Sequence, residues 1–394
     1  MSDLITIDEA RRRVLGAIAP LPAEDVPLSE ALDRVLAEDV HSAIDVPPFD
    51  SSALDGYAVV AGPAAGLELI GESRAGHPEG GRLRPGAAIR ISTGAAVPEG
   101  ATAVVALERA EGAESVVRVE ESSQGDNIRR AGEDVRAGAL VLRPGTRLGP
   151  AELGAAASVG RAALSCARRP RAALVLTGDE LTEPGEPLGP GRIYGSNGLA
   201  LAAQVQRAGA VLARRENVPD DAGRTQEALA RALEDADVVI VSGGVSVGPH
   251  DHVKGAFGRL GVEERFWGVR LRPGKPTWFG VRDGLLAFGL PGNPVSSMVT
   301  FQLFVRPALA ALQGADPSAT RAEAVLDEPV ARSPRREEAV RVRLRPGPGG
   351  WRATTTGPQG SHILTSMLGA AALARIPPGE GELAAGERVE IELL

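Results

Sequence analysis

The sequence predicts a multidomain protein built around an open α/β sheet, and the first reason is three apolar runs that each end in a small polar loop. Such runs, with helical patterns between or after them, are typical of parallel strands that alternate with helices. Sheets of this kind bind ligands at the carboxyl ends of their strands. The runs and their loops are residues 172–176 before 177–180, 238–241 before 242–248, and 285–288 before 289–294.

Length and composition favour a protein of several packed domains and disfavour a general nucleic-acid binder. A chain of 394 residues is too long for one ordinary core, and its apolar content of 43% is ample for packing. The net charge of −8 argues against a general nucleic-acid binder. The apolar run 148–163 is short and interrupted by Glu152 and Arg161, so a buried helix is favoured over a membrane span. The single Cys166 and the lack of a signal-peptide pattern predict a cytoplasmic protein.

Composition shifts along the chain predict four domains. Helical patterns cover residues 5–40 and 149–168, with one helix starting near Ile7 and a second near Leu28, capped by Ser29. Between them lie short β-type runs with frequent turn signals. We therefore expect a helical and extended domain I (1–45 plus 147–170), a β-rich domain II (46–146), an α/β domain III (171–315) and a C-terminal β domain IV (316–394).

The loop from Ser242 to Asp251 is the sharpest local signal. Gly243, Gly244 and Ser246 can hold a phosphate through backbone amides and a hydroxyl, and Asp251 can hold a divalent cation against it. A plain βα turn with a capping aspartate is the alternative. The pentapeptide 244–248 also fits a nucleophile-elbow pattern, but Pro249 and the missing orienting histidine disfavour a hydrolase.

Two further loops carry groups suited to anions. Arg272 and Lys275 lie three residues apart in a turn that prolines make rigid. Pro291, Asn293 and Pro294 open an apolar helix whose first amides form a natural anion site. A solvated surface turn and simple helix capping are the respective alternatives.

Carboxylates in loops form a candidate Mg²⁺ site if they converge. They are Asp55, Glu180, Asp220 and Asp251, and hard cations prefer such oxygen ligands. Each alone is more typical of a cap or a surface charge. The five histidines show no metal-binding spacing.

Eight motifs follow one another along nearly the whole chain. They are residues 45–59, 91–95, 125–134, 177–181, 243–251, 273–276, 290–294 and 360–362. Each motif is modest alone, but their common order is specific. Together they resemble one family, the molybdopterin molybdenumtransferases of the MoeA type, which are related to the E domain of gephyrin and to the plant cofactor-insertion protein.

The resemblance implies a four-domain subunit in a homodimer, whose α/β domain has the adenylyltransferase-like fold of the MogA/MoaB type. It implies molybdenum cofactor biosynthesis: molybdate and adenylylated molybdopterin react, AMP leaves, and Mg²⁺ is the cofactor. Asp55, Thr93, Glu180, Asp251 and Lys275 are then expected to be catalytic. The resemblance adds Arg341 and Ser361 to the expected substrate-binding residues, and it implies that Asp55 and Thr93 face the α/β domain of the partner subunit. Contacts with molybdopterin adenylyltransferase and with molybdoenzyme maturation proteins are also implied.

The sequence departs from the family pattern at a few positions. Gly268 stands where many members carry lysine after a Phe-Trp pair, with Arg270 as a possible replacement, and Arg272 replaces a frequent lysine. Two other functions remain open at this point. A molybdopterin adenylyltransferase needs little more than the α/β domain, and a gephyrin-like scaffold carries additional linker regions.

Overall fold

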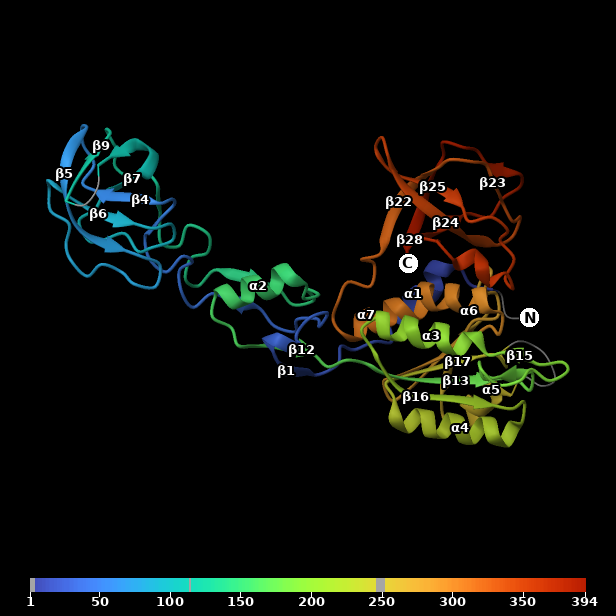
Figure 1. Cartoon of the computed structure of the whole chain (residues 1–394). Coiled ribbons are helices and arrows are strands. Elements are labelled where there is room, and N and C mark those ends of the chain that lie inside the picture. Colours follow the sequence, from blue (N-terminus) through green and yellow to red (C-terminus); the bar gives the residue numbers. More distant parts are fainter. Residues whose placement is uncertain (1–3, 113–114, 246–251) are drawn as a thin grey trace. The chain divides into compact units, whose positions relative to one another are not determined.

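The computed structural model of the chain describes residues 4–112, 115–245 and 252–394. They fold into two compact units, which are described separately below (Figure 1). Unit 1 comprises residues 1–24, 33–37 and 165–394, and unit 2 comprises residues 25–32 and 38–164. Strands β1 (Ala23–Pro27) and β12 (Ala163–Ala167) lie where the chain passes between the units.

Unit 2 is a β module around a six-stranded sheet of order β7-β4-β6-β5-β9-β8. Alternating apolar residues bury both of its faces, with Tyr57, Val105 and Val117 in one cluster and Ile89 and Val104 in another. The predicted runs near residues 88, 103 and 116 are strands of this sheet. The elements of the unit are η1 (Leu28–Glu30), β2 (Val40–His41), β3 (Ser51–Ser52), β4 (Gly56–Val59), β5 (Ala65–Ser73), β6 (Ala87–Ile91), β7 (Ala103–Ala106), η2 (Leu107–Arg109), β8 (Ala110–Glu111), β9 (Val116–Val119), β10 (Ile128–Arg129), β11 (Leu140–Leu142) and α2 (Pro150–Ser158).

Two predicted helices differ in the structure. The helix expected from Leu28 is only the 3₁₀ turn Leu28–Glu30. A longer helix could not pass Asp33 in any case, because its φ of 62° is a left-handed conformation. The helix expected over 149–168 ends at Ser158, and Ala163–Ala167 is strand β12 instead.

Unit 1 contains the predicted α/β sheet, in the order β16-β13-β17-β21-β20-β18. The first four strands are parallel, whereas β20 is antiparallel to β21 and β18 is antiparallel to β20. The three apolar runs of the sequence are the central strands β13, β17 and β21. The sheet strands are β13 (Arg171–Thr177), β16 (Val211–Val218), β17 (Val238–Ser242), β18 (Glu263–Trp267), β20 (Trp278–Arg282) and β21 (Leu285–Leu290).

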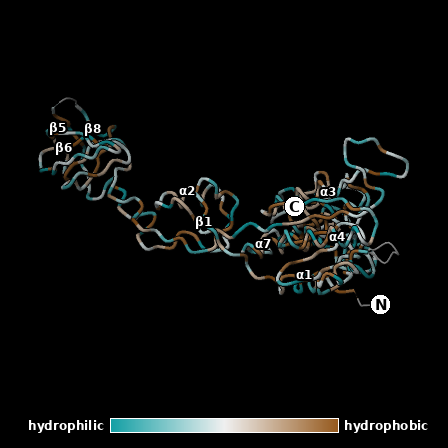
Figure 2. The backbone as a smooth tube through the Cα atoms, turned by 90° about the horizontal axis from the view of Figure 1, so that it is seen from below, coloured by the Kyte–Doolittle hydropathy of each residue, from teal (hydrophilic) through white to brown (hydrophobic). Residues whose placement is uncertain are grey.

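Helices cover both faces of this sheet (Figure 1). α1 (Ile7–Leu15), α3 (Ser196–Arg207), α6 (Pro294–Thr300), the π-helical turn η3 (Phe301–Val305) and α7 (Arg306–Leu312) pack on one face. α4 (Ala222–Asp235) and α5 (Val253–Arg259) pack on the other. Figure 2 shows that hydrophobic segments are gathered in the part of the chain that carries this sheet and its helices.

The described residues contain one helical run long and apolar enough to cross a membrane, Pro294–Leu312. Within it, 83% of the most apolar window is buried inside the structure. It is therefore a core helix of the α/β layer.

The C-terminal part of unit 1 forms a small barrel. Its strands lie in the order β24-β25-β22-β28-β26, and a further pairing of β24 with β26 closes this sheet into a barrel. β19 (Leu271–Arg272), which comes from the α/β part, pairs in parallel with β24 and joins the two parts. The remaining elements of unit 1 are β14 (Leu181–Thr182), β15 (Ile193–Tyr194), β22 (Arg321–Leu326), β23 (Val330–Ala331), β24 (Glu337–Gly347), β25 (Gly350–Thr355), η4 (Leu364–Met367), β26 (Ala372–Ile376), β27 (Glu382–Leu383) and β28 (Arg388–Leu393).

Candidate active site

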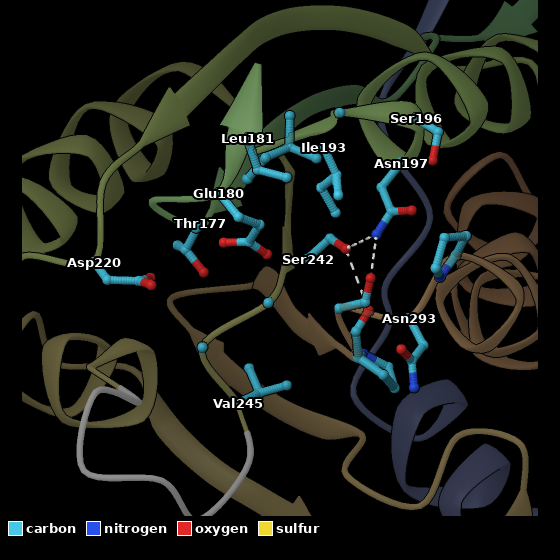
Figure 3. Close-up of a pocket in the computed structure, with 18 of the residues that line it drawn as sticks. Thr177, Glu180, Leu181, Ile193, Ser196, Asn197, Asp220, Ser242, Val245 and Asn293 are labelled. Atoms are coloured by element: carbon cyan, nitrogen blue, oxygen red, sulfur yellow. Dashed lines mark hydrogen bonds between the residues drawn. The ribbon is translucent and has the colours of Figure 1, made fainter. Parts of the chain in front are cut away.

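A pocket of about 490 Å³ lies at the carboxyl ends of β13, β17 and β21 (Figure 3). This is the edge at which the sequence predicted a ligand site. The short parallel strands β14 and β15 and the first residues of α3 and α6 complete the wall. The lining residues are Leu176, Thr177, Gly178, Glu180, Leu181, Ile193, Tyr194, Gly195, Ser196, Asn197, Asp220, Ser242, Gly243, Gly244, Val245, Pro276, Pro291, Gly292, Asn293 and Pro294.

The turn Gly243–Gly244 requires glycine for both conformation and space. Its φ angles are 99° and 63°. A Cβ on Gly243 would lie 2.7 Å from the Thr177 hydroxyl, and one on Gly244 would lie 2.8 Å from a methyl of Val253. The Gly243 N–H donates to the Leu290 carbonyl at 3.1 Å, which fixes the start of the turn against β21. Predicted residues Gly243 and Gly244 thus form the floor of the pocket, whereas Ser246 and Asp251 lie outside the described residues.

Asn197, which the sequence analysis missed, ties three wall segments together. Its Nδ2 donates to Ser242 Oγ at 2.9 Å and to the Gly292 carbonyl at 2.7 Å (Figure 3). Ser242 Oγ in turn donates to the Pro291 carbonyl at 3.3 Å. The only sequence signal was a polar residue in the first turn of a helix that follows a short strand, which is common and unspecific.

The start of α6 brings Ser361 of the C-terminal part to the rim of the pocket. Asn293 is the N-cap, Pro294 is the first helical residue, and both line the pocket together with Pro291. The Asn293 amide donates to Ser361 Oγ at 3.2 Å, and the Val295 N–H donates to the Ser361 carbonyl at 3.2 Å. The loop around Ser361 therefore caps the helix end that was predicted as an anion site.

Two of the four predicted metal-binding carboxylates, Glu180 and Asp220, line the pocket. Asp220 is held by a reciprocal pair of bonds: its N–H donates to Asp179 Oδ1 at 3.2 Å, and its Oδ2 accepts from the Asp179 N–H at 3.4 Å. Within the described residues, no group of three or more histidine, cysteine, aspartate or glutamate side chains has the arrangement of a metal site. Asp55 belongs to unit 2.

The basic turn at 272–275 lies beside the pocket but does not line it. Arg272 Nη1 donates to Glu338 Oε1 at 2.8 Å and is more than half exposed. Lys275 is exposed, and the next residue, Pro276, is part of the pocket wall. The Thr277 hydroxyl donates to the Gly274 carbonyl at 2.7 Å, which holds the turn in shape.

Arg341, a predicted substrate-binding residue, is 1% exposed and does not line the pocket. Its guanidinium donates to Ser366 Oγ at 3.2 Å and to the Gly360 carbonyl at 3.3 Å. Burial lowers the pKa of Arg341 to about 10, and the nearby Glu338 opposes that shift. In this structure Arg341 therefore braces the loop that carries Ser361.

Asp55 and Thr93 contact each other in unit 2. Asp55 Oδ1 accepts hydrogen bonds from the Thr93 N–H at 2.8 Å and from Thr93 Oγ1 at 3.3 Å, and both residues are exposed. They come from separate loops, after β3 and after β6, so the sheet brings them together.

The departure at Gly268 has a packing reason. Gly268 has a φ of 88°, and a Cβ there would lie 2.6 Å from Leu4 Cδ2. The N-terminal segment pairs along this stretch, because Ile5 N–H donates to the Gly268 carbonyl and Arg270 N–H donates to the Ile5 carbonyl. The space of a side chain at position 268 is thus occupied by the N-terminal segment, and Arg270 is exposed.

Comparison with known proteins accounts for the whole chain. Residues 5–160 match the MoeA N-terminal region (domain I and II), residues 173–311 a probable molybdopterin binding domain, and residues 323–394 the MoeA C-terminal region (domain IV). A MoeA crystal structure from Pyrococcus horikoshii superposes with a TM-score of 0.84 at 31% identity, covering 100% of both chains.

Curated relatives agree over the full length. Molybdopterin molybdenumtransferase 2 of Mycobacterium tuberculosis is 39% identical, with 98% of each chain covered. The molybdopterin molybdenumtransferase of Haemophilus influenzae is 35% identical, covering 99% of this chain and 98% of its own. The chain belongs to the MoeA family of molybdopterin molybdenumtransferases.

Proposed function

We propose that this chain inserts molybdenum from molybdate into adenylylated molybdopterin and releases AMP. As a family member it is a transferase of molybdenum cofactor biosynthesis. The observation that carries the proposal is the pocket at the carboxyl edge of the α/β sheet, whose glycine turn and helix start suit the phosphates of a nucleotide-tagged substrate.

The substrate's phosphates lie, in this proposal, on the turn Gly243–Gly244 and at the start of α6 near Asn293. Arg272 and Lys275 attract molybdate and the phosphates by charge, and Ser361 contributes a hydroxyl from the C-terminal part. Arg341 acts through the 360–366 loop, since its guanidinium bonds to that loop support a positioning role.

The acidic residues of the pocket fit a hard cation. Glu180 and Asp220 supply oxygen ligands in the wall, and Asp251 and the partner's Asp55 are the further carboxylates of the proposal. Mg²⁺ bound there would offset the charge of the leaving phosphate. The residues of this chain orient the phosphates against Lys275.

A homodimer completes the site in this proposal. The partner subunit's Asp55 and the partner's Thr93 face the pocket, so two copies share each site. We also propose a cytoplasmic location and four domains with the borders given above. Handover contacts with molybdopterin adenylyltransferase and with molybdoenzyme maturation proteins are part of the same proposal.

One assay separates this function from the alternatives. The purified chain is incubated with adenylylated molybdopterin, Mg²⁺ and increasing molybdate, and AMP is quantified. Molybdate-dependent AMP release supports insertion. Consumption of MgATP with bare molybdopterin would indicate an adenylyltransferase instead, and inactivity in both assays would indicate a scaffold.

A further inference from the structure

Lysine is rare in this chain, and both lysines lie close in sequence to residues that line the pocket. Of 43 lysine and arginine residues only two are lysines, Lys254 and Lys275. Lys275 precedes the wall residue Pro276, and Lys254 lies in the first turn of α5. All the others are arginines, whose guanidinium is planar, whereas the lysine ammonium is compact.

Lys254 contacts a tryptophan that in turn holds the glycine turn. The Lys254 ammonium lies 4.3 Å from the centroid of the Trp267 ring, within the range of a cation–π interaction. The Trp267 indole N–H donates to the Val245 carbonyl at 3.0 Å. Val245 is the residue directly after Gly243–Gly244, and it lines the pocket.

The sheet topology explains how an edge strand reaches the turn. β18 is antiparallel to β20 and β20 is antiparallel to β21, so β18 ends at the same edge as β17. Trp267 is its last residue. Val245 packs over Gly289 of β21, where a Cβ would lie 2.5 Å from a Val245 methyl. The chain leaving β17 therefore crosses β21 toward Trp267.

A turn of two glycines needs fixed ends, because glycine has the largest backbone freedom to lose. The Gly243 N–H bond to Leu290 fixes its start, and the Trp267 indole fixes its end. Trp267 itself is oriented by the core around Trp278 and by the Lys254 ammonium.

We propose that Trp267, steadied by Lys254, is a positioning residue that holds the glycine turn in the shape that receives the substrate's phosphates. The inference deepens the proposed function and rests on it for the identity of the ligand. Trp267 touches no reacting atom, so its loss weakens binding of the nucleotide end more than it slows the chemical step.

The test compares Trp267→Phe with Trp351→Phe, a change to a half-exposed tryptophan on the C-terminal barrel. Phenylalanine keeps an aromatic ring, smaller than the indole, but removes the N–H donor. We expect Trp267→Phe to raise the KM for adenylylated molybdopterin about fivefold, as loss of one hydrogen bond predicts, with kcat nearly unchanged. Trp351→Phe should leave both constants at wild-type values. A wild-type KM in Trp267→Phe overturns the proposal.

AMP binding gives a readout that does not need turnover. Tryptophan emission is recorded while AMP is added, and AMP affinity is measured by calorimetry. We expect an emission change in the wild type and in Trp351→Phe, and a weaker AMP affinity in Trp267→Phe. If the wild type binds AMP but produces no AMP in the turnover assay, the proposed reaction is wrong. The AMP affinities of the two proteins still test the positioning role in that case. Equal AMP affinity in wild type and Trp267→Phe, or no binding to either, overturns the inference.

Lys254→Met decides the question if Trp267→Phe does not fold. Methionine keeps an apolar stem over the ring but removes the charge. We expect AMP affinity to fall about threefold, in line with a cation–π contact of this kind. An unchanged affinity would contradict the steadying role of Lys254.

Discussion

Asp55 accepts both polar hydrogens of Thr93 on one carboxylate oxygen, with the backbone N–H at 2.8 Å and the hydroxyl at 3.3 Å. The contact has two chemical meanings. Asp55 either shapes the Thr93 loop or brings its negative charge to the reaction. Asparagine distinguishes them, because it keeps an acceptor oxygen for Thr93 but carries no charge.

We expect Asp55→Asn and Asp55→Ala each to lower kcat about a hundredfold, as loss of an essential electrostatic group predicts. The folded state should be retained, since Asp55 is exposed. Molybdate-dependent AMP release and circular dichroism are the measurements. Near-normal turnover in the asparagine variant would show that Asp55 only positions Thr93.

Asn197→Ala tests whether the start of α3 must be joined to the end of β17 and to the loop after β21 for binding. The change removes the donor to Ser242 and Gly292, leaving two acceptors without that partner. We expect kcat/KM to fall at least tenfold and the free energy of unfolding to fall by about 1–3 kcal/mol. Gln206→Ala, at an exposed position late in the same helix, is the control and should change neither. Equal behaviour of the two variants would remove Asn197 from the site.

Gly243→Ala and Gly185→Ala form a matched pair for the glycine turn. Their φ angles are 99° and 100°, but a Cβ meets Thr177 in the first case and nothing within 4 Å in the second. Gly185→Ala should lower the free energy of unfolding by about 1–2 kcal/mol, because alanine is strained in this backbone conformation. Gly243→Ala should lower the free energy of unfolding further, as measured by chemical denaturation. It should also abolish AMP binding, as measured by calorimetry. Similar losses in both would mean that contact with Thr177 is unimportant.

Strand and loop patterns identified most of the pocket because strand ends in a parallel sheet meet by geometry. Gly243, Gly244, Pro291 and Asn293 line the pocket for this reason. Asn197 could not be predicted in the same way, since its role comes from the distance between three segments that the sequence does not order in space.

Other residues acquired their role only from packing. The sequence assigned no role to Trp267, and its indole N–H matters because the turn after β17 crosses toward it. Arg341 was expected to contact an anion, but the fold buries it beneath the Ser361 loop. At position 268 the left-handed backbone, with a φ of 88°, favours glycine, and Leu4 packs where a side chain would begin.

Asp50 links the stability of unit 2 to pH. A hydrogen bond from the Ala131 N–H, followed by the Arg130 guanidinium, lowers the pKa of Asp50 below the ordinary 3.8. A carboxyl whose pKa is lower in the folded state than in the unfolded state stabilises the folded state at any pH above its unfolded pKa. This contribution is lost as the pH falls through the lowered pKa of the folded state. The free energy of unfolding should therefore decline less in Asp50→Asn than in the wild type as the pH falls below about 4. Urea unfolding across this range measures it, with Glu111→Gln as an exposed control that should decline like the wild type.

Lys275 tests whether the basic turn acts by charge or by the shape of its cation. Lys275→Met removes the charge, and Lys275→Arg keeps it with a larger, planar group. We expect Lys275→Met to lower kcat/KM about a hundredfold. Lys275→Arg should restore only part of that loss, because a guanidinium cannot place its charge as a compact ammonium does.

Arg388→Met, which removes an exposed charge from the barrel, is the control and should keep wild-type kinetics. Full activity in Lys275→Arg would mean that charge alone is required at this turn. Full activity in Lys275→Met would exclude Lys275 from anion binding.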